Sequence, residues 1–266
     1  MSEGTKEPKG QPLVTGLLRG LEVLRCFDLG HERLGSSDIA RMTGLPQPTV
    51  WRLCKTLEHG GYLIADRDGS RFRPGLSILT LGYAALDTLE LAELARPLLQ
   101  DVATRFHGGA SLSTRERTSM LYLQRYEAPN AVLNVNVRVG SEVPIMNSGT
   151  GWAYLAGLDD AARAQALHEC QAANGALYKK HEKGALKAVA EYRKLGFITN
   201  IDVFFPGLST VAVPLPTGPG GTPYVLNCTS PSAALADPEV RHEAGLALMH
   251  AVEQLRRAAA RLDAAG

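Results

Sequence analysis

Apolar side chains recur at helical spacing in three successive segments of the N-terminal region. In the first, from Gly16 to Asp28, the apolar positions are Leu17, Leu18, Leu21, Leu24 and Phe27. The second helix is expected to begin at Ser36 or Ser37, because a serine hydroxyl can accept a hydrogen bond from an unpaired helix amide. In the third, the apolar stripe consists of Val50, Leu53, Cys54 and Leu57, at i, i+3, i+4 and i+7. The pattern predicts three short helices, each with one buried face.

The connection between the second and third helices carries the signals of a sharp turn. Gly44 can adopt the positive φ that a turn requires, and Pro46 prevents the preceding helix from continuing. Pro48 suits the first turn of the following helix. Two helices joined in this way are the outline of a DNA-binding helix-turn-helix. Short amphipathic helix pairs also occur in folds that never bind DNA, so the pattern leaves both interpretations open.

A short hairpin is expected after the third helix, with the turn signal Asp68-Gly69 between two strand-forming runs. Arg67, Arg71 and Arg73 decorate this hairpin. A hairpin with arginines beside a recognition helix is typical of the winged variant of the motif, in which the wing contacts phosphate or the minor groove. The alternative is a solvated sheet edge whose charges prevent aggregation.

Polar side chains on the third helix and the hairpin supply the candidate DNA contacts. The predicted set is Ser37, Gln47, Thr49, Arg52, Thr56, Arg67, Arg71 and Arg73. Thr49 and Arg52 are the predicted base contacts, because such side chains can reach base edges in the major groove. Residues 41–73 hold six Lys or Arg and three Asp or Glu, a net charge of +3, whereas the whole chain carries +1. Attraction to nucleic acid is therefore expected to be local, which argues against a packaging role.

Residues 75–106 predict a mostly helical segment with leucine on more than one face. Pro97 lies within this segment and is expected to end or kink the helix near Arg96. A helix that is apolar on several faces must be covered by its own chain or by a second subunit. The segment is therefore expected to link two domains and to dimerise, and a purely intramolecular connector is the alternative.

Strand and helix patterns are mixed from residue 107 to residue 266. The expected strands are ASLSTRER, TSMLYLQRYE, AVLNVNVRVG, FITN, LSTVAVPL and YVLNCTS. This mixture predicts an α+β domain with an antiparallel sheet. Asn147 or Ser148 is expected to cap a helix that begins near Gly149, and the bare first amides of such a helix can bind a carboxylate. A tight turn that needs glycine for its backbone conformation is the alternative.

Length and composition exclude several classes of protein. The 266 residues are enough for two domains. The sequence has no run of 18 or more apolar residues, so no membrane span is expected. Residues 1–12 are polar, are expected to form a flexible tail and have no signal-peptide core. The four cysteines are far apart and show no CxxC spacing, so neither a metal site nor a disulfide framework is expected. We expect no cofactor and a location in the reducing cytoplasm.

The ordered series of segments resembles transcriptional regulators of the IclR family. The resemblance is carried by RGLEVLRCFD, SSDIARMTGLPQPTVWRLCKTLEHGGYL, the arginine wing, the Pro97 linker, SGTGWAYLAG, RKLGFITNIDVFFPGLSTVAVPL and YVLNCTSPSA. It implies a winged helix-turn-helix domain at 13–74, a linker and dimerisation helix at 75–106, and a GAF-like or profilin-like effector-binding domain at 107–266. It also implies dimers or tetramers on palindromic double-stranded DNA, with a small organic acid as effector.

Carried over by motif, the resemblance also assigns residues to the effector pocket. These are Gly149, Thr150, Gly151, Asn200, Asp202, Thr210, Asn227 and Thr229. Amides and hydroxyls of this kind can bind a carboxylate without a metal or a lysine. The chain departs from the family pattern at Trp152, where lysine is common, and at Val203, Phe204 and Phe205, where an acidic residue is common. If these aromatic side chains line the pocket, the effector is larger or aromatic; positions in the core or an interface are the alternative.

Two other classes of function are weighed against a regulator. The chain has no GxSxG, HExxH or P-loop motif, so no catalytic residues are assigned and no enzymatic activity is expected. A small hydrolase is the weaker alternative, because residues far apart in the sequence can still form a triad. The second alternative is a small-molecule sensor whose helix-turn-helix mediates protein contact.

Overall fold

The computed structural model describes residues 13–27, 31–87, 90–133, 136–215 and 223–263. The chain divides into two compact units, one up to Ala85 and the other from Leu86 onward. The expected flexible tail at 1–12 and the last residue of the first expected helix, Asp28, lie outside the described residues. None of the helices described is long and apolar enough to cross a membrane.

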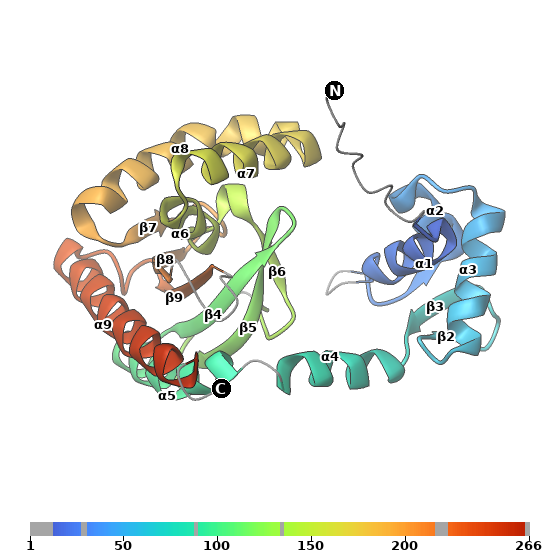
Figure 1. The fold of residues 1–266 in the computed structure, drawn as a ribbon, viewed down its shortest axis with the longest axis horizontal. Helices are drawn as coiled ribbons and strands as arrows, with labels where there is room; N and C mark the ends of the chain where they lie inside the picture. Colours follow the sequence, from blue (N-terminus) through green and yellow to red (C-terminus); the bar gives the residue numbers. More distant parts are fainter. Residues whose placement is uncertain (1–12, 28–30, 88–89, 134–135, 216–222, 264–266) are drawn as a thin grey trace, which may run out of the picture. The chain divides into compact units, whose positions relative to one another are not determined.

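The N-terminal unit is a winged helix-turn-helix, as predicted. Its elements are α1 (Thr15–Arg25), β1 (Leu34–Gly35), α2 (Ser36–Thr43), α3 (Gln47–His59), β2 (Leu63–Ala65) and β3 (Arg71–Pro74). The strands form an antiparallel sheet in the order β1-β3-β2 (Figure 1). Val23, Ile39, Val50 and Phe72 are fully buried, so the three helices and the hairpin share one small core.

The start of α2 differs from the prediction in its capping residue. Gly35, not Ser36 or Ser37, is the N-cap, and its backbone N–H donates to the Asp38 carboxylate over 3.2 Å. The acidic side chain in the first turn therefore caps the helix and leaves the Ser36 hydroxyl free to contact α3. The turn after α2 is confirmed, because Gly44 adopts a left-handed conformation with φ of 69°.

The C-terminal unit is an α+β domain built on one antiparallel sheet. Its elements are α5 (Glu90–Arg105), β4 (Gly109–Glu116), β5 (Ser119–Glu127), β6 (Glu142–Pro144), η1 (Ile145–Asn147), α6 (Gly149–Gly157), α7 (Asp160–Ala173), α8 (Gly175–Leu195), β7 (Ile198–Ile201), β8 (Leu208–Leu215), β9 (Tyr224–Pro231) and α9 (Pro238–Asp263). The six strands lie in the order β6-β5-β4-β9-β8-β7. Helices α5 and α9 cover one face of the sheet, and α6, α7 and α8 cover the other (Figure 1).

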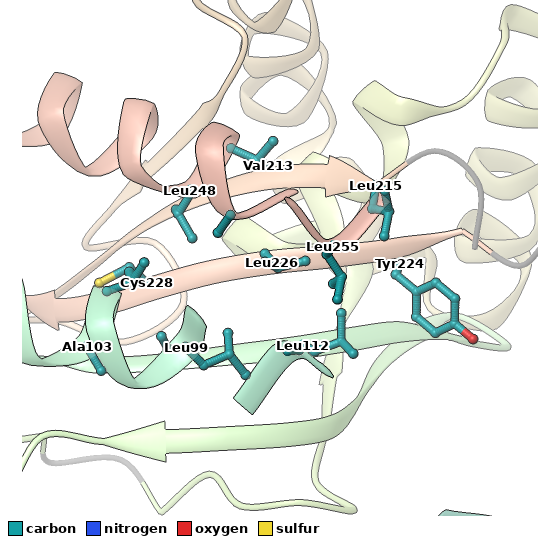
Figure 2. Close-up of a cluster of buried hydrophobic side chains, with 14 of the residues drawn as sticks. Leu99, Ala103, Leu112, Val213, Leu215, Tyr224, Leu226, Cys228, Leu248 and Leu255 are labelled. Carbon is teal, nitrogen blue, oxygen red and sulfur yellow. The ribbon is translucent and has the colours of Figure 1, made fainter. Parts of the chain in front are cut away.

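The face of the sheet toward α5 and α9 is entirely apolar at its centre. Figure 2 shows Leu99 of α5, Leu112 of β4, Leu226 of β9 and Leu255 of α9 in one cluster, and each is fully buried. Because side chains alternate along a strand, the neighbours of Leu112 point to the opposite face. That opposite face carries the polar residues of the pocket described below.

The alternating segment AVLNVNVRVG, expected as a strand, forms none in its described residues 131–133 and 136–140. Asn134 and Val135 lie outside the described residues. The edge of β5 is occupied instead by β6, which pairs Met120 with Val143. Val137 packs against the α6 side of the sheet, whereas Val132 is 71% exposed. The alternating apolar residues of this segment therefore do not form one buried strand face.

The segment expected as one linker consists of two helices in different environments. In α4 (Ser77–Asp87), three large apolar residues, Leu79, Leu81 and Tyr83, are between 54 and 59% exposed. α5 buries Leu91 and Leu99 in the core of the C-terminal unit, so it belongs to that domain. α5 continues through Pro97, so the helix does not end near Arg96, and a kink at this position stays a prediction.

Candidate functional site

The exposed face of α3 carries most of the residues expected to contact DNA. Val50 and Cys54 anchor the helix in the core, and burial raises the pKa of the Cys54 thiol to about 11. On the opposite face Arg52 and Thr56 are exposed, and the Thr56 hydroxyl donates to the Arg52 carbonyl oxygen over 2.9 Å. Thr49 is half-buried. The arginine is therefore the longest polar side chain that this face presents.

Gln47 connects the two helices of the motif. Its side-chain amide donates to the Ser36 hydroxyl over 3.0 Å, across the turn between α2 and α3. Ser36 is buried, whereas Ser37 and Gln47 are exposed. The hydrogen bond fixes the orientation of the glutamine at the beginning of the recognition helix.

The wing places its arginines around one buried aromatic side chain. Phe72 is fully buried, while Arg71, Arg73 and Arg67 are exposed. At the tip, the Asp68 carboxylate accepts hydrogen bonds from the backbone N–H and hydroxyl of Ser70, which lower the pKa of that carboxyl. The strand alternation therefore sends one side chain into the core and its basic neighbours to solvent.

Sequence reasoning missed two further residues on this face. Trp51 is 40% exposed and meets Phe72 edge to face, with ring centroids 5.8 Å apart. The Lys55 ammonium lies 5.8 Å from the centre of the Trp51 ring. Trp51 of α3 therefore contacts both the wing, through Phe72, and the basic side chain of Lys55. The signal in the sequence was a tryptophan outside the apolar stripe of Val50, Leu53, Cys54 and Leu57.

In the C-terminal unit, the N-terminus of α6 opens toward the polar face of the sheet. Ser148 is the N-cap, and its hydroxyl oxygen accepts from the Gly151 amide over 3.1 Å, as one of the two expected caps. The amides of Gly149 and Thr150 donate no hydrogen bond to the described residues. Two N–H groups with the positive end of a helix dipole are therefore available to an anion.

A pocket lies at this helix end and holds about 420 Å³, including the part open to solvent. Its lining residues are Tyr122, Arg125, Val137, Ser148, Gly149, Thr150, Phe204, Leu208, Thr210 and Thr229. One part of the wall is polar, with hydroxyls and a guanidinium, and the other is apolar. The chemistry suits a small organic anion with an apolar body.

Four of the residues assigned to the pocket by resemblance line it, namely Gly149, Thr150, Thr210 and Thr229. Gly151 instead packs against the backbone of Ile145, which leaves no space for a side chain. The Asp202 carboxylate accepts from the Gly207 amide and the Ser232 hydroxyl, over 2.8 and 2.6 Å. Asp202 therefore organises its own loop and does not line the pocket.

The two asparagines in that set lie beside the pocket wall. Asn200 pairs with Thr210 across β7 and β8, and Asn227 donates to the Thr229 hydroxyl over 3.2 Å. Asn200 Nδ2 and Asn227 Oδ1 are buried and have no hydrogen-bond partner among the described residues. Unpaired buried polar atoms are rare in proteins, so this end of the sheet can bind further polar groups.

The three aromatic residues at the departures from the family pattern lie in three environments. Phe204 lines the pocket, whereas Phe205 is 39% exposed. Trp152 is buried in the core, and its indole N–H donates to the Met146 carbonyl oxygen over 2.7 Å. Of these three residues, Phe204 alone lines the pocket.

Two side chains on β5 complete the pocket and were missed by sequence reasoning. Burial raises the pKa of Tyr122, while the charge of Arg125 and a hydrogen bond with Thr150 act in the opposite direction. The Arg125 side chain is 7% exposed. No group of three or more His, Cys, Asp or Glu in the described part of the chain could hold a metal.

Two family models match consecutive parts of the chain. The IclR helix-turn-helix domain matches residues 16–67, and the bacterial transcriptional regulator IclR C-terminal domain matches residues 83–259. The regulator TsaQ1/TsaQ2 of Comamonas testosteroni is 30% identical over 251 residues, which cover 94% of this chain and 90% of the relative. The C-terminal match alone spans more than half of the chain.

Two solved structures are also similar. An IclR family transcriptional regulator from Brucella abortus has a TM-score of 0.86 and 32% identity, with 97% of this chain and 96% of that chain covered. An IclR homologue from Microbacterium hydrocarbonoxydans, complexed with 4-hydroxybenzoate, has a TM-score of 0.65 and 22% identity, with 91% and 99% covered. The second likeness shows the fold alone. The two domains, their order and these matches show that the chain belongs to the IclR family of transcriptional regulators.

Proposed function

We propose that this regulator binds specific double-stranded DNA through α3 and the wing, and that a small carboxylate bound in the C-terminal pocket controls this binding. The observation that carries the proposal is the pocket wall, in which free helix amides and hydroxyls face an apolar side. A helix N-terminus favours anions, and the apolar side favours an organic body. No catalytic residue and no cofactor is part of the proposal.

An aromatic acid is the proposed effector class. Phe204 lines the pocket, and a protein of similar fold holds 4-hydroxybenzoate. The enclosed part of the pocket is narrow, so a ring can enter only if side chains at its wall move. A ligand controls an equilibrium only if it binds one arrangement better than another, and such a movement supplies that difference.

The proposed DNA-binding form is a dimer or tetramer on a palindromic operator. The exposed Leu79, Leu81 and Tyr83 of α4 are the candidate contacts with a second copy. Two recognition helices related by a two-fold axis bind half-sites separated by about one helical turn, roughly 34 Å, or a multiple of it.

The test is a titration of the purified protein with the DNA upstream of its own gene, with an unrelated fragment of equal length as control. Specific binding should exceed non-specific binding by at least about 1,000-fold. Addition of 4-hydroxybenzoate should change the affinity for the specific fragment only. Absence of binding to either fragment at low salt would favour the alternative of a sensor whose helix-turn-helix contacts protein.

A further inference from the structure

Arg125 on β5 is a buried charge with incomplete pairing. Its side chain is 7% exposed. Nη1 donates to the Ser111 hydroxyl over 3.1 Å and Nη2 to the Glu127 carboxylate over 3.3 Å, while the buried Nε has no partner among the described residues. Burying an N–H of a charged group without an acceptor costs free energy. Stability alone therefore does not explain why an arginine is buried at this position.

The strand register directs this side chain to the pocket. β4 and β5 pair Leu112 with Gln124 and Ser113 with Tyr122, so one extra residue of β5 lies between them. Such a bulge changes which side chains share a face. Tyr122 and Arg125, three residues apart, consequently both line the pocket on the α6 side.

Gly109, which pairs with Glu127 across β4 and β5, provides the space for the Arg125 guanidinium. A Cβ at Gly109 would lie 2.5 Å from Nη2 and 2.9 Å from Cζ of Arg125. On the other side, Ser111 pairs with Arg125 and with Asn227 in neighbouring strands. The guanidinium thus lies beside small and polar residues of the neighbouring strands.

We propose that Arg125 is the residue that selects a carboxylate as the effector, by pairing with it through the Nε side of the guanidinium. The inference rests on the proposed function, because it assumes that the pocket is the effector site. Arg125, Gly149 and Thr150 line the same pocket, so a fixed charge and two free amides act on one anion. A planar guanidinium binds a carboxylate in a bidentate manner, and pairing in a buried site is stronger than in water.

Glu127 accepts from one N–H of Nη2, so the second N–H of Nη2 and the Nε–H remain for a ligand. Its carboxylate is 43% exposed and contacts only Nη2. Val137, Phe204 and Leu208 face the remaining part of the pocket. The ligand class that fits both parts is a monocarboxylate with a compact apolar body, such as a benzoate.

The experiment measures binding of benzoate, 4-hydroxybenzoate and neutral 4-hydroxybenzamide to the full chain by calorimetry and thermal shift. Wild-type protein should bind at least one acid and should not bind the amide. Arg125→Met should lower the affinity for that acid by roughly 100-fold, and Arg125→Lys by less, because lysine keeps the charge without the fork. Without ligand, Arg125→Met should unfold at the same temperature as wild type or higher, since a buried charge is replaced by an apolar side chain.

The matched control is Arg115→Met. Arg115 is a partly buried arginine on β4 that pairs with Glu169 and Tyr154 and does not line the pocket. This variant should bind the acid like wild type. The inference is overturned if wild type binds none of the acids, if it binds the amide equally well, or if Arg125→Met retains the affinity. Specific DNA binding by wild type, measured in parallel, would leave the DNA-binding part of the proposed function standing in each of these cases.

Discussion

The arginines of the wing and the arginine of the pocket use the same side chain in opposite environments. Arg71 and Arg73 are exposed around the buried Phe72, whereas the Arg125 side chain is 7% exposed and only partly paired. An exposed arginine remains hydrated, so its attraction to phosphate acts through a screened field and costs little stability. A buried arginine has lost that hydration, so its environment selects one anion of defined shape.

The comparison teaches that one chain can separate two tasks by burial. Arg52, Arg71 and Arg73, which are proposed to contact DNA, are exposed and lie outside the core of the winged domain. The pocket of the C-terminal unit shares its walls with the sheet and α6, so a ligand there necessarily acts on packed residues. The substitutions below test this difference, because exposed positions should change affinity alone, whereas added volume in the pocket wall should change affinity and stability together.

The largest effect is expected for Arg52→Ala on the exposed face of α3. Loss of this proposed base contact should lower specific DNA affinity by up to about 100-fold and relax the preference at one base pair. The unfolding midpoint should stay unchanged, because the side chain is exposed. Competition binding and thermal unfolding measure the two quantities. A fall in the unfolding midpoint would show that Arg52 supports the fold and would weaken the comparison.

A buried counterpart is Gly149→Ala at the start of α6. The added Cβ would lie 2.7 Å from the Thr210 methyl and 3.2 Å from the Asn200 Cβ, inside the pocket wall. Overpacking of this kind costs about 1–3 kcal/mol, and the carboxylate affinity should fall at least about tenfold in the same variant. The control is Gly175→Ala in α8, where no atom lies within 4 Å of the added carbon. Unchanged ligand binding by Gly149→Ala would place the effector elsewhere.

The double variant Arg71→Ala/Arg73→Ala tests the wing. Both side chains are exposed, so specific and non-specific DNA affinity should fall together, by about tenfold at moderate salt. The slope of log affinity against log salt should decrease by about two, because two phosphate contacts are lost. Affinity measured at four salt concentrations gives the slope. A loss confined to one DNA sequence would instead assign base reading to the wing.

The smallest effect concerns pH and the core of the C-terminal unit. Burial raises the pKa of the Cys228 thiol to about 11 from its ordinary 9.0. The unfolded chain therefore loses this proton first, and the stabilising contribution, fully present below pH 9, is lost as pH rises toward 11. Between pH 8 and 10 wild type should lose roughly 1 kcal/mol more unfolding free energy than Cys228→Ala. Equal losses in urea denaturation of the two proteins would contradict the assignment.

The winged domain could be predicted from local sequence because its signals are local. Gly44 has the expected left-handed φ, Pro48 lies in the first turn of α3, and the wing turn surrounds Asp68 and Gly69. The departures were also local in origin. The N-cap of α2 is Gly35 and not a serine, because the Asp38 carboxylate, three residues later, accepts a hydrogen bond from the Gly35 backbone N–H.

The pocket was predicted only in part because its walls come from strands far apart in the sequence. The cap at Ser148 is local and was expected, whereas the direction of Arg125 depends on a bulge in the pairing of β4 with β5. Asp202 has a positive φ of 55° and is committed to the Gly207 and Ser232 contacts of its loop, which no spacing in the sequence indicates. The likeness to a family supplied the region, and tertiary register decided which side chains line it.

The central claim is that α3 reads a specific DNA sequence, and the most direct measurement is selection from random-sequence duplexes by the purified chain. Wild type should enrich one inverted repeat whose half-sites are about 10 base pairs apart, centre to centre, or a multiple of that spacing. Arg52→Ala, selected in parallel, should lose the preference at one position of each half-site. Failure of wild type to enrich any motif at low or moderate salt would contradict the account.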